Sequence, residues 1–402
     1  MRSTNGRGPL GNIRVIEAGT LIAGPFCGQL LGDLGAEVIK IESPGTGDPL
    51  RTWRRLNGDG PSLWWPIIAR NKKSITLDLR QAEGQVLAAR LIRGADVLIE
   101  NFRPGTMERW NLGYGTLSLA NPGLVMARMS GFGQTGPYKD QAGFGSVGEA
   151  MGGIRYVTGY PDRPPPRVGV SIGDSLTALF GAVGVLSALN SRGQTGRGQI
   201  VDAALYESVL GVMECLVTEF DKTGVIRERS GSILPGVAPS NVYPCADGRD
   251  IVIGANGNGV FRRLSEAMGR PELADSVEFS TTEQRGVRQA ELDALIGAWT
   301  SALPSDVVLE RMRASGVPAG MIYRAPEMLA DPHFAEREAI VDVAGGVLGM
   351  LKMQNVFPRL SETPGEIRWA GPTLGQHNDE IYRGLLGLPA DELAELQGKG
   401  VI

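Results

Sequence analysis

Asp174 is a carboxylate that stands between two apolar segments of the chain. Val168–Ile172 predicts a short strand that ends at Gly173, and a long helix is predicted from there to about Leu189. A carboxylate at a helix N-terminus can cap the N–H groups of the first turn. It can also act as a nucleophile, because the positive helix end stabilises the anion and a partly dry site raises its reactivity. Capping is the commoner role, and these residues alone leave both open.

The predicted helix behind Asp174 has almost no polar surface. Large apolar residues recur at helical spacing, and small residues occupy the positions between them. This pattern predicts a helix buried on nearly every side, with glycine and alanine allowing neighbouring backbones to approach closely. The residues are Leu176, Leu179, Phe180, Val183, Leu186 and Leu189, with Gly181, Ala182 and Gly184 among them.

Composition excludes several classes of protein. Of 402 residues 42% are hydrophobic, and 40 basic against 44 acidic residues give a net charge of −4, which is unsuited to binding polyanions or membrane surfaces. The N-terminus lacks the apolar core of a signal peptide and is expected to be a mobile leader. Cys27, Cys215 and Cys245 form no Cys-x-x-Cys pair, so we expect three buried thiols in a reducing, cytoplasmic compartment.

The two histidines limit the possible chemistry. A Ser-His-Asp site, a Cys-His site and most zinc sites would need His333 or His377. His333 lies in a turn that opens a predicted helix, and His377 lies in a polar Gln-His-Asn-Asp stretch. Both are typical of solvated or capping residues. The sequence therefore predicts catalysis without histidine and no metal site.

Strands and helices alternate over the first 130 residues. This alternation predicts β-α-β units and an α/β fold with a Rossmann-like, doubly wound parallel sheet. Ligands of such sheets bind beyond the carboxyl ends of the strands, where this chain repeatedly places glycine-bearing turns. The predicted strands are 13–17, 37–42, 74–79, 96–100 and 124–129, and the predicted helices are 25–34, 81–92 and 115–120.

The sequence pattern changes from about Lys222. Val201 to about Phe220 predicts one long apolar helix that leads out of the first domain. Segments 240–245 and 249–254 flank an Asp-Gly turn and predict a hairpin. Helices near 260–268, 289–303 and 305–314 and a strand at 319–324 complete a smaller α+β domain. The tail predicts a strand at 347–356 and helices near 379–386 and 390–397.

One motif suggests a dinucleotide. Gly131, Gly133 and Gly136 match G-x-G-x-x-G, and Glu149 follows the first glycine by 18 residues. The motif does not follow the first predicted strand, and Pro-Tyr-Lys-Asp-Gln-Ala-Gly after it is not the opening of an amphipathic helix. An NAD site is therefore not expected.

Taken in order, several motifs give the chain a family resemblance. The motifs are Ile-Glu-Ala-Gly…Ala-Gly-Pro (16–25), Gly-Ala-Glu-Val-Ile-Lys-Ile-Glu (35–42), Asn-Lys-Lys-Ser (71–74), Glu-Asn-Phe-Arg-Pro-Gly (100–105), Gly-Phe-Gly-Gln-Thr-Gly-Pro (131–137), Gly-Asp-Ser (173–175) and Thr-Gly-Arg-Gly-Gln (195–199). With these motifs the chain resembles the class III CoA-transferases, the family of formyl-CoA transferase and carnitine CoA-transferase, over nearly its whole length.

The resemblance implies a role for Asp174 and a fold for the chain. In this family the Asp of the Gly-Asp-Ser turn is the nucleophile, which forms an acyl-aspartyl anhydride and then an aspartyl-CoA thioester, with neither metal nor NAD. The resemblance also implies a cytoplasmic, interlocked homodimer. Its large, CoA-binding domain is expected at 1–221 and 325–402, and its small domain at 222–324.

The resemblance further implies residues that bind the substrates, an acyl-CoA and a carboxylic acid. The expected CoA contacts are Leu77, Arg80, Asn101, Phe102 and Arg109. The N–H groups that stabilise each oxyanion are expected in one of two glycine-rich segments, 131–136 or 254–259. The acids themselves are expected to be short-chain or dicarboxylic.

Departures from the family pattern leave alternatives. Ile22 stands where the formyl-CoA transferases have a Gln that handles the acyl group, and their active-site glycine loop has no clear counterpart, so formate and oxalate are disfavoured. The related α-methylacyl-CoA racemases use a His where Gly143 and Phe144 stand, and Phe144 cannot move a proton. A non-catalytic acyl-CoA-binding subunit is the third possibility, although the Gly-Asp-Ser turn is retained.

Overall fold

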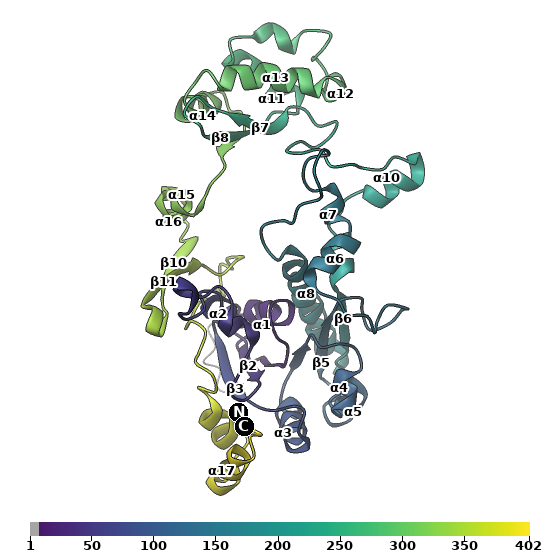
Figure 1. Cartoon of the computed structure of the whole chain (residues 1–402), viewed down its shortest axis with the longest axis vertical. Helices are drawn as coiled ribbons and strands as arrows, with labels where there is room; N and C mark the ends of the chain where they lie inside the picture. The colour runs from purple at the N-terminus through teal and green to yellow at the C-terminus, as the bar shows by residue number, and fades with distance from the viewer. Residues whose placement is uncertain (1–7) are drawn as a thin grey trace. The chain divides into compact units, whose positions relative to one another are not determined.

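The computed structural model describes residues 8–402, which form two compact units (Figure 1). Unit 1 contains the chain up to Ile154, Val168–Cys215 and Glu336–Ile402, and unit 2 contains Arg155–Arg167 and Leu216–Ala335. Unit 2 thus includes a segment before Asp174 that the sequence analysis assigns to the large domain. Most of the predicted leader, residues 1–7, lies outside the described residues.

Unit 1 is built on a six-stranded parallel sheet with the order β3-β2-β1-β4-β5-β6. This is the strand order of a doubly wound nucleotide-binding fold, which confirms the predicted fold class. The order reverses between β1 and β4, where ligands of such sheets bind. The strands are β1 Arg14–Glu17, β2 Glu37–Glu42, β3 Lys72–Thr76, β4 Val97–Glu100, β5 Val125–Ser130 and β6 Ile200–Ala204.

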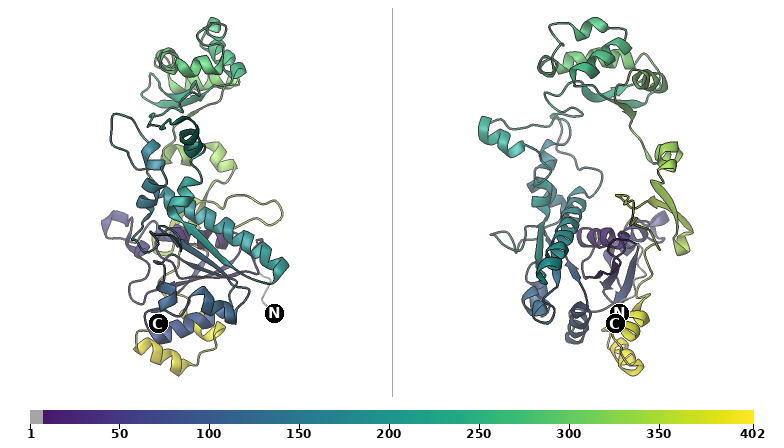
Figure 2. Two further views of the ribbon diagram at one scale, coloured as in Figure 1. Left: turned by 90° about the vertical axis from the view of Figure 1, so that its right-hand side faces the viewer. Right: turned by 180° about the vertical axis from the view of Figure 1, so that it is seen from behind.

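Alternating side chains of the strands feed two apolar cores, one on each face of the sheet. On β1, Val15 packs into the core under α1 and α8, whereas Ile16 packs into the core under α3 and the C-terminal segment. Figure 2 shows α8 (teal) on one face and the C-terminal helices (yellow) on the other. The α-helices are α1 Ala23–Asp33, α2 Trp65–Ile68, α3 Ala82–Arg93, α4 Thr106–Arg109, α5 Tyr114–Ala120, α6 Gly145–Met151, α8 Ile172–Thr195, α9 Leu205–Leu210 and α17 Ala390–Gly398. Short 3-10 helices are η1 Pro49–Thr52, η2 Leu56–Gly58 and η4 Gly346–Leu348, and η5 Glu380–Leu385 is a π-helix.

The C-terminal segment completes the outer edge of the sheet at β3. His377 and Ser74 exchange two hydrogen bonds: the His377 N–H donates to the Ser74 carbonyl (2.9 Å), and the Ser74 N–H donates to Nδ1 of His377 (3.1 Å). Tyr382 is fully buried, and its hydroxyl donates to the Thr76 carbonyl (2.6 Å). His377, predicted to be a solvated or capping residue, is therefore half-buried and acts as a structural link that accepts the Ser74 N–H.

Two predictions next to Asp174 are wrong. Val168–Ile172 is not a strand: the helix α8 already begins at Ile172, and Val170 is exposed. The predicted helix Val201–Phe220 is instead the strand β6, the helix α9 and, in unit 2, the helix α10 Leu216–Thr223. Residues 200–204 become a strand because they pair with β5, a long-range interaction that an apolar run does not reveal.

Helix α8 is buried on one side only. Its small residues face the sheet as predicted, since a Cβ on Gly181 would overlap Met129 and one on Gly184 would lie 2.5 Å from Val201. The prediction of burial on nearly every side is wrong, because a row of large apolar side chains is 37–60% exposed: Leu179, Phe180, Val183 and Leu186. By length and composition α8 is also the one helix in residues 8–402 that could cross a membrane, but its other side packs on α1 and the sheet.

Unit 2 holds a three-stranded antiparallel sheet with the order β7-β8-β9. The predicted hairpin is present as β7 Ser240–Pro244 and β8 Asp250–Gly254, and β9 is Ala319–Met321. Its helices are α11 Asn258–Ala267, α12 Thr282–Val287, α13 Gln289–Thr300, α14 Ser305–Ala314 and α15 Ala325–Ala330, with a 3-10 helix η3 at Pro271–Ala274. Two further helices span a boundary between the units, α7 Ile154–Val157 and α16 Pro332–Glu336.

The tail in unit 1 differs from its prediction in one respect. The expected strand at 347–356 is one half of an antiparallel hairpin, β10 Ile340–Ala344 with β11 Met350–Gln354.

Candidate active site

Asp174 lies in the first turn of α8, against the start of α6. The helix begins at Ile172, so Asp174 is its third residue. The Asp174 carboxylate occupies the space beside Gly145, because a Cβ on Gly145 would overlap its Oδ2 and lie 2.7 Å from its Cγ. Glycine at position 145 is therefore what leaves room for this carboxylate.

A second carboxylate accepts a hydrogen bond from the first turn of α8. Glu149 is fully buried on α6, and its Oε1 accepts the N–H of Gly173 at 3.4 Å. A Cβ on Gly173 would lie 3.1 Å from Cγ of Glu149, so the two helices approach closely at this point. The N–H of Gly173, in the first turn of α8, thus has an acceptor on the neighbouring helix α6.

The loop after β1 runs beside the sheet edge and contains Ile22. Leu21 has a left-handed backbone with φ of 65°, and its N–H donates to both carboxylate oxygens of Asp48 at 3.2 Å. Asn101, after β4, holds Thr20 in a reciprocal pair: its Oδ1 accepts the Thr20 N–H (2.8 Å) and its Nδ2 donates to the Thr20 carbonyl (2.7 Å). Both contacts fix the shape of this loop.

A buried network of charges lies beneath the same loop. Lys40 pairs with Glu17 (3.1 Å) and Asp48 (2.9 Å), and Lys72 pairs with Glu17 (2.7 Å). Burial disfavours the charge on Lys40, but the carboxylates of Asp48 and Glu17 outweigh it and raise the pKa of Lys40. Burial lowers the pKa of Lys72 despite the attraction of Glu17. The buried lysines and carboxylates thus neutralise one another, and Asp48 also binds the Leu21 N–H of the loop above them.

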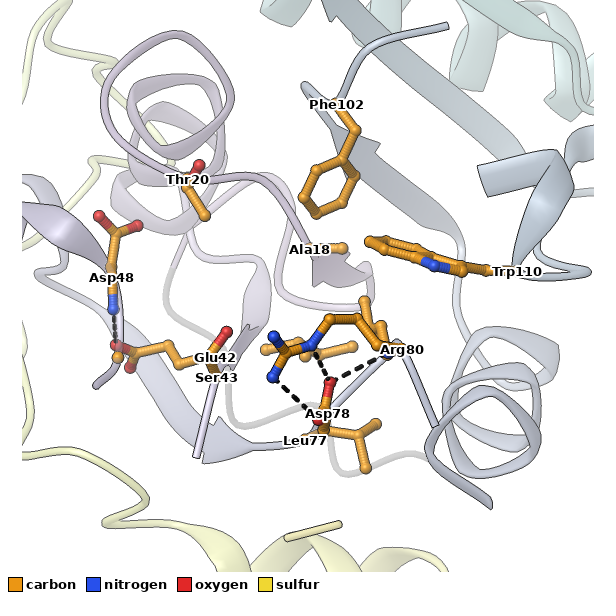
Figure 3. A pocket seen from close by; sticks show the side chains of 13 residues that line it. Ala18, Thr20, Glu42, Ser43, Asp48, Leu77, Asp78, Arg80, Phe102 and Trp110 are labelled. Carbon is orange, nitrogen blue, oxygen red and sulfur yellow. Dashed lines mark hydrogen bonds and ion pairs between the residues drawn. The ribbon is translucent and has the colours of Figure 1, made fainter. Parts of the chain in front are cut away.

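A pocket of about 170 Å³ opens at the carboxyl ends of β1 to β4 (Figure 3). Its apolar wall includes Phe102 and Trp110, whose rings meet edge to face at 5.0 Å. Arg80 lies below these rings in Figure 3 and is fixed by Asp78, whose carboxylate accepts from its Nε (2.8 Å) and Nη2 (3.0 Å). The lining residues are Ala18, Thr20, Ile41, Glu42, Ser43, Gly47, Asp48, Leu77, Asp78, Leu79, Arg80, Phe102 and Trp110.

The structure brings three of the five expected CoA contacts to this pocket. Leu77, Arg80 and Phe102 line it. Asn101 does not line it but ties the neighbouring loop, as described above, and Arg109 is an exposed residue whose Nη2 donates to the Thr106 hydroxyl.

Sequence reasoning missed two residues of the pocket that carry a clear contact. Trp110 follows the Glu-Asn-Phe-Arg-Pro-Gly motif by five residues, and an aromatic so close to a ligand turn is a signal that could have been used. Asp48 lies in a loop after β2 with no motif of its own, and only its bonds to Leu21 and Lys40 show its role.

The first expected oxyanion segment, 131–136, is a loop after β5 whose amides are partly engaged. The N–H of Gly133 donates to the Ser130 hydroxyl (3.0 Å), and the N–H of Gln134 donates to Asp202 (2.9 Å). No helix begins in this loop, and the next one, α6, starts only at Gly145. The loop therefore lacks the helix that a dinucleotide fingerprint requires.

The second expected segment, 254–259, is a mostly exposed loop of unit 2 that joins β8 to α11. It is held from inside by Arg285, a fully buried guanidinium whose Nη2 donates to the Asn256 carbonyl (2.6 Å) and to Oδ1 of Asn258 (2.9 Å). Because a trans peptide points its C=O and N–H in opposite directions, the N–H of Gly257 is directed away from Arg285.

The three cysteines differ in their burial, and the described residues hold no cluster of metal ligands. Cys27 and Cys245 are buried as predicted, but Cys215 is exposed, against the prediction. Burial, and secondly the charge of Glu17, raise the pKa of the Cys27 thiol, which keeps it protonated. Within residues 8–402 no group of three His, Cys, Asp or Glu side chains is placed to hold a metal ion.

Comparisons with known proteins agree with this architecture. Residues 10–378 match the family model described as CoA-transferase family III. The chain is 60% identical over 394 residues to succinyl-CoA–D-citramalate CoA-transferase of Chloroflexus aurantiacus, covering 98% of both chains. It is 43% identical over 397 residues to the beta subunit of succinyl-CoA–L-malate CoA-transferase of the same organism, again covering 98% of both.

A solved structure shares the fold. A CaiB/BaiF family protein from Brucella suis superimposes with a TM-score of 0.83 at 35% identity, covering 94% of this chain and all of that one. Sequence motifs, sheet order and relatives therefore lead to one conclusion: the chain belongs to CoA-transferase family III.

Proposed function

We propose that this CoA-transferase moves CoA from succinyl-CoA to a dicarboxylic acid of the citramalate or malate type, with Asp174 as the nucleophile. The observation that carries the proposal is the position of Asp174. Its carboxylate lies in the first turn of α8, beside Gly145, which has no side chain to occupy that space. The acids are those in the names of two relatives that match the chain over 98% of its length.

The chemistry needs only a carboxylate and CoA. Asp174 attacks the thioester carbonyl of the donor, which gives an acyl-aspartyl anhydride and releases CoA thiolate. The thiolate attacks the Asp174 carbonyl, which forms an aspartyl-CoA thioester and releases the donor acid. The acceptor carboxylate then attacks this thioester, and the thiolate attacks the acceptor side of the second anhydride. The product is the new acyl-CoA, and Asp174 is regenerated without any net proton or water.

The pocket at the carboxyl ends of β1 to β4 is proposed to hold the nucleotide end of CoA. Phe102 and Trp110 offer an aromatic surface for the adenine, and Arg80 offers a guanidinium for a phosphate. Asn101 contributes by fixing the loop at Thr20, and Arg109 contributes a second exposed cation near the turn.

Backbone N–H groups are proposed to stabilise the oxyanion of each tetrahedral intermediate, with the glycine-rich segments 131–136 and 254–259 as the candidates. In segment 131–136 two of the amides already have protein acceptors, those of Gly133 and Gln134. In segment 254–259 a Cβ on any of the three glycines would meet no backbone, so the fold of unit 2 does not require glycine there.

A cytoplasmic homodimer is the proposed form of the enzyme. The exposed apolar row on α8, from Leu179 to Leu186, is the kind of surface that a second copy of the chain would cover. A heteromeric arrangement is the alternative, since one relative is named as a subunit.

The proposed nucleophile is tested by Asp174→Ala, with Asp140→Ala, an exposed loop aspartate, as the matched control. Succinyl-CoA is incubated with D-citramalate, L-malate and monocarboxylic acids, and new CoA esters are measured. We expect transfer to the dicarboxylic acids, a loss of at least about 10³-fold in the Asp174 variant and no change in the control. Hydroxylamine should convert Asp174 to a hydroxamate only when succinyl-CoA is present.

Other outcomes distinguish the alternatives. Activity of the Asp174→Ala protein at the wild-type level would exclude this residue as the nucleophile. Binding of succinyl-CoA without any hydroxamate would identify a binding subunit. Exchange of the proton next to the thioester without CoA transfer would identify a racemase.

A further inference from the structure

Glu149 is a buried carboxylate that no step of the proposed reaction uses. It lies on α6 with no exposed surface, although a carboxylate loses much hydration energy when it is buried. Its Oε1 accepts the N–H of Gly173, the residue directly before Asp174. A carboxylate buried at this point needs a reason beyond packing.

The short helix α6 faces two neighbours with two sets of residues. Gly145 and Glu149, four positions apart and therefore on one face, meet the first turn of α8. Gly148 and Gly152 meet α9, because a Cβ on Gly148 would lie 2.6 Å from Leu205 and one on Gly152 would lie 2.5 Å from Val209. One face of α6 thus contacts Asp174 and the peptide before it, and the other face packs on α9.

We propose that Glu149 is the positioning residue of the nucleophile, an inference that rests on the proposed role of Asp174. Gly173 is the second residue of α8, where an N–H group has no acceptor within the helix, and it has no side chain of its own to fix the peptide before Asp174. The Glu149 carboxylate supplies an acceptor for the Gly173 N–H, which restrains that peptide. Gly145, one turn earlier on the same face, provides the space into which the Asp174 carboxylate points.

Two residues of α6 therefore position the nucleophile together. Glu149 fixes the backbone before Asp174 through the Gly173 N–H, and Gly145 leaves space for the Asp174 side chain. Attack on a thioester requires the carboxylate oxygen within about 3–3.5 Å of the carbonyl carbon, and a displacement of 1 Å can lower a rate by about 100-fold. Loss of the Glu149 acceptor should consequently slow the formation of the anhydride more than it weakens the binding of succinyl-CoA.

The test compares Glu149→Ala with Glu149→Gln in the full-length enzyme. The amide oxygen of glutamine can still accept the Gly173 N–H, whereas alanine cannot. We expect kcat to fall about 30- to 100-fold in the alanine variant with KM for succinyl-CoA within about twofold of wild type. The glutamine variant should keep kcat within about fivefold. The rate of hydroxamate formation at Asp174 should follow kcat in both variants.

Gly152→Ala is the matched control, because it disturbs α6 on the face that packs on α9. It should lower Tm while kcat stays within about threefold of wild type. The proposal is wrong if Glu149→Ala keeps the wild-type rate of Asp174 acylation, if glutamine does not restore it, or if Gly152→Ala slows it equally. These results are separate from the test of the nucleophile itself, which is the loss of hydroxamate and of transfer in Asp174→Ala.

Discussion

The carboxylate of Asp174 fills the space that a side chain on Gly145 would need. Gly145 is the first residue of α6 and Asp174 the third residue of α8, so the starts of two helices meet at this point. The contact explains why position 145 tolerates no Cβ with the present position of Asp174. It also makes the place of the carboxylate sensitive to a single methyl group.

Gly145→Ala should therefore displace Asp174 and lower activity while the fold persists. A Cβ at 145 would lie 2.7 Å from Cγ of Asp174, a distance that real Cβ atoms do not adopt, so the carboxylate has to move. We expect kcat for CoA transfer to fall by about 100-fold or more. Gly193→Ala is the control, because Gly193 lies on the same helix as Asp174 and a Cβ there would meet nothing within 4 Å. Equal activity of the two variants would contradict this account.

Arg285 should be a main source of stability in unit 2. Its guanidinium is fully buried and donates to neutral oxygens, among them the carbonyls of Ala238 (3.1 Å) and Phe279 (2.8 Å). Arg285→Met would leave these buried carbonyls without their donor, which should cost about 3 kcal/mol or more in urea denaturation. The same change at Arg288, whose exposed guanidinium lies 3.4 Å from Glu291, should cost less than about 0.5 kcal/mol. Similar losses at both positions would refute the assignment.

His377 should make the stability of the protein depend on pH below neutrality. Burial, with the charge of Lys73 acting in the same direction, lowers the pKa of His377 below its ordinary value of 6.5. The unfolded chain then binds a proton that the folded chain excludes, so stability is complete above pH 6.5 and decreases as the pH falls below it. Protonation of Nδ1 would also remove the acceptor of the Ser74 N–H.

Denaturation by urea at pH 7.5 and pH 5.5 measures this effect. His377→Gln, which does not titrate, should be less stable than wild type at pH 7.5 by about 1 kcal/mol, because the bond to Ser74 is weakened. It should lose less stability between the two pH values. His333→Gln should retain the wild-type dependence, and an unchanged dependence in His377→Gln would show that another group is responsible.

Much of the fold could be predicted because its signals are local. The strand β2 has the predicted bounds, and the alternation of strands and helices up to β5 is confirmed, since each element carries its own periodicity. The strand β6 could not be predicted, because Ile200–Ala204 continues into the apolar helix α9 without a break and becomes a strand only by pairing with β5. The exposed side of α8 was missed for a related reason: apolar composition does not say whether a side chain is covered.

The candidate site could be predicted only in part. Gly-Asp-Ser indicates a carboxylate at a helix start, and Leu77, Arg80 and Phe102 do meet in one pocket. In the sequence Glu149 stands out only as the acid that follows a glycine motif. Its contact with Gly173 arises from the packing of α6 on α8, two helices separated by 20 residues, and no local pattern encodes such a contact.

The apolar row on α8 gives the last prediction, which concerns assembly. Val183 is 60% exposed at the centre of this row, so Val183→Asp should change the stability of a single chain by no more than about 0.5 kcal/mol. In a dimer that covers the row, the same aspartate would be buried without a partner and would oppose association. In sedimentation velocity we expect the wild type at twice the chain mass of 42.7 kDa and the variant at that of one chain. Val86→Asp, at a valine of α3 that is 61% exposed and lies outside the row, should leave the wild-type mass unchanged. A monomeric wild type, or a dimeric Val183→Asp protein, would show that α8 is not the contact between copies, because a buried aspartate could not be accommodated there without loss of affinity.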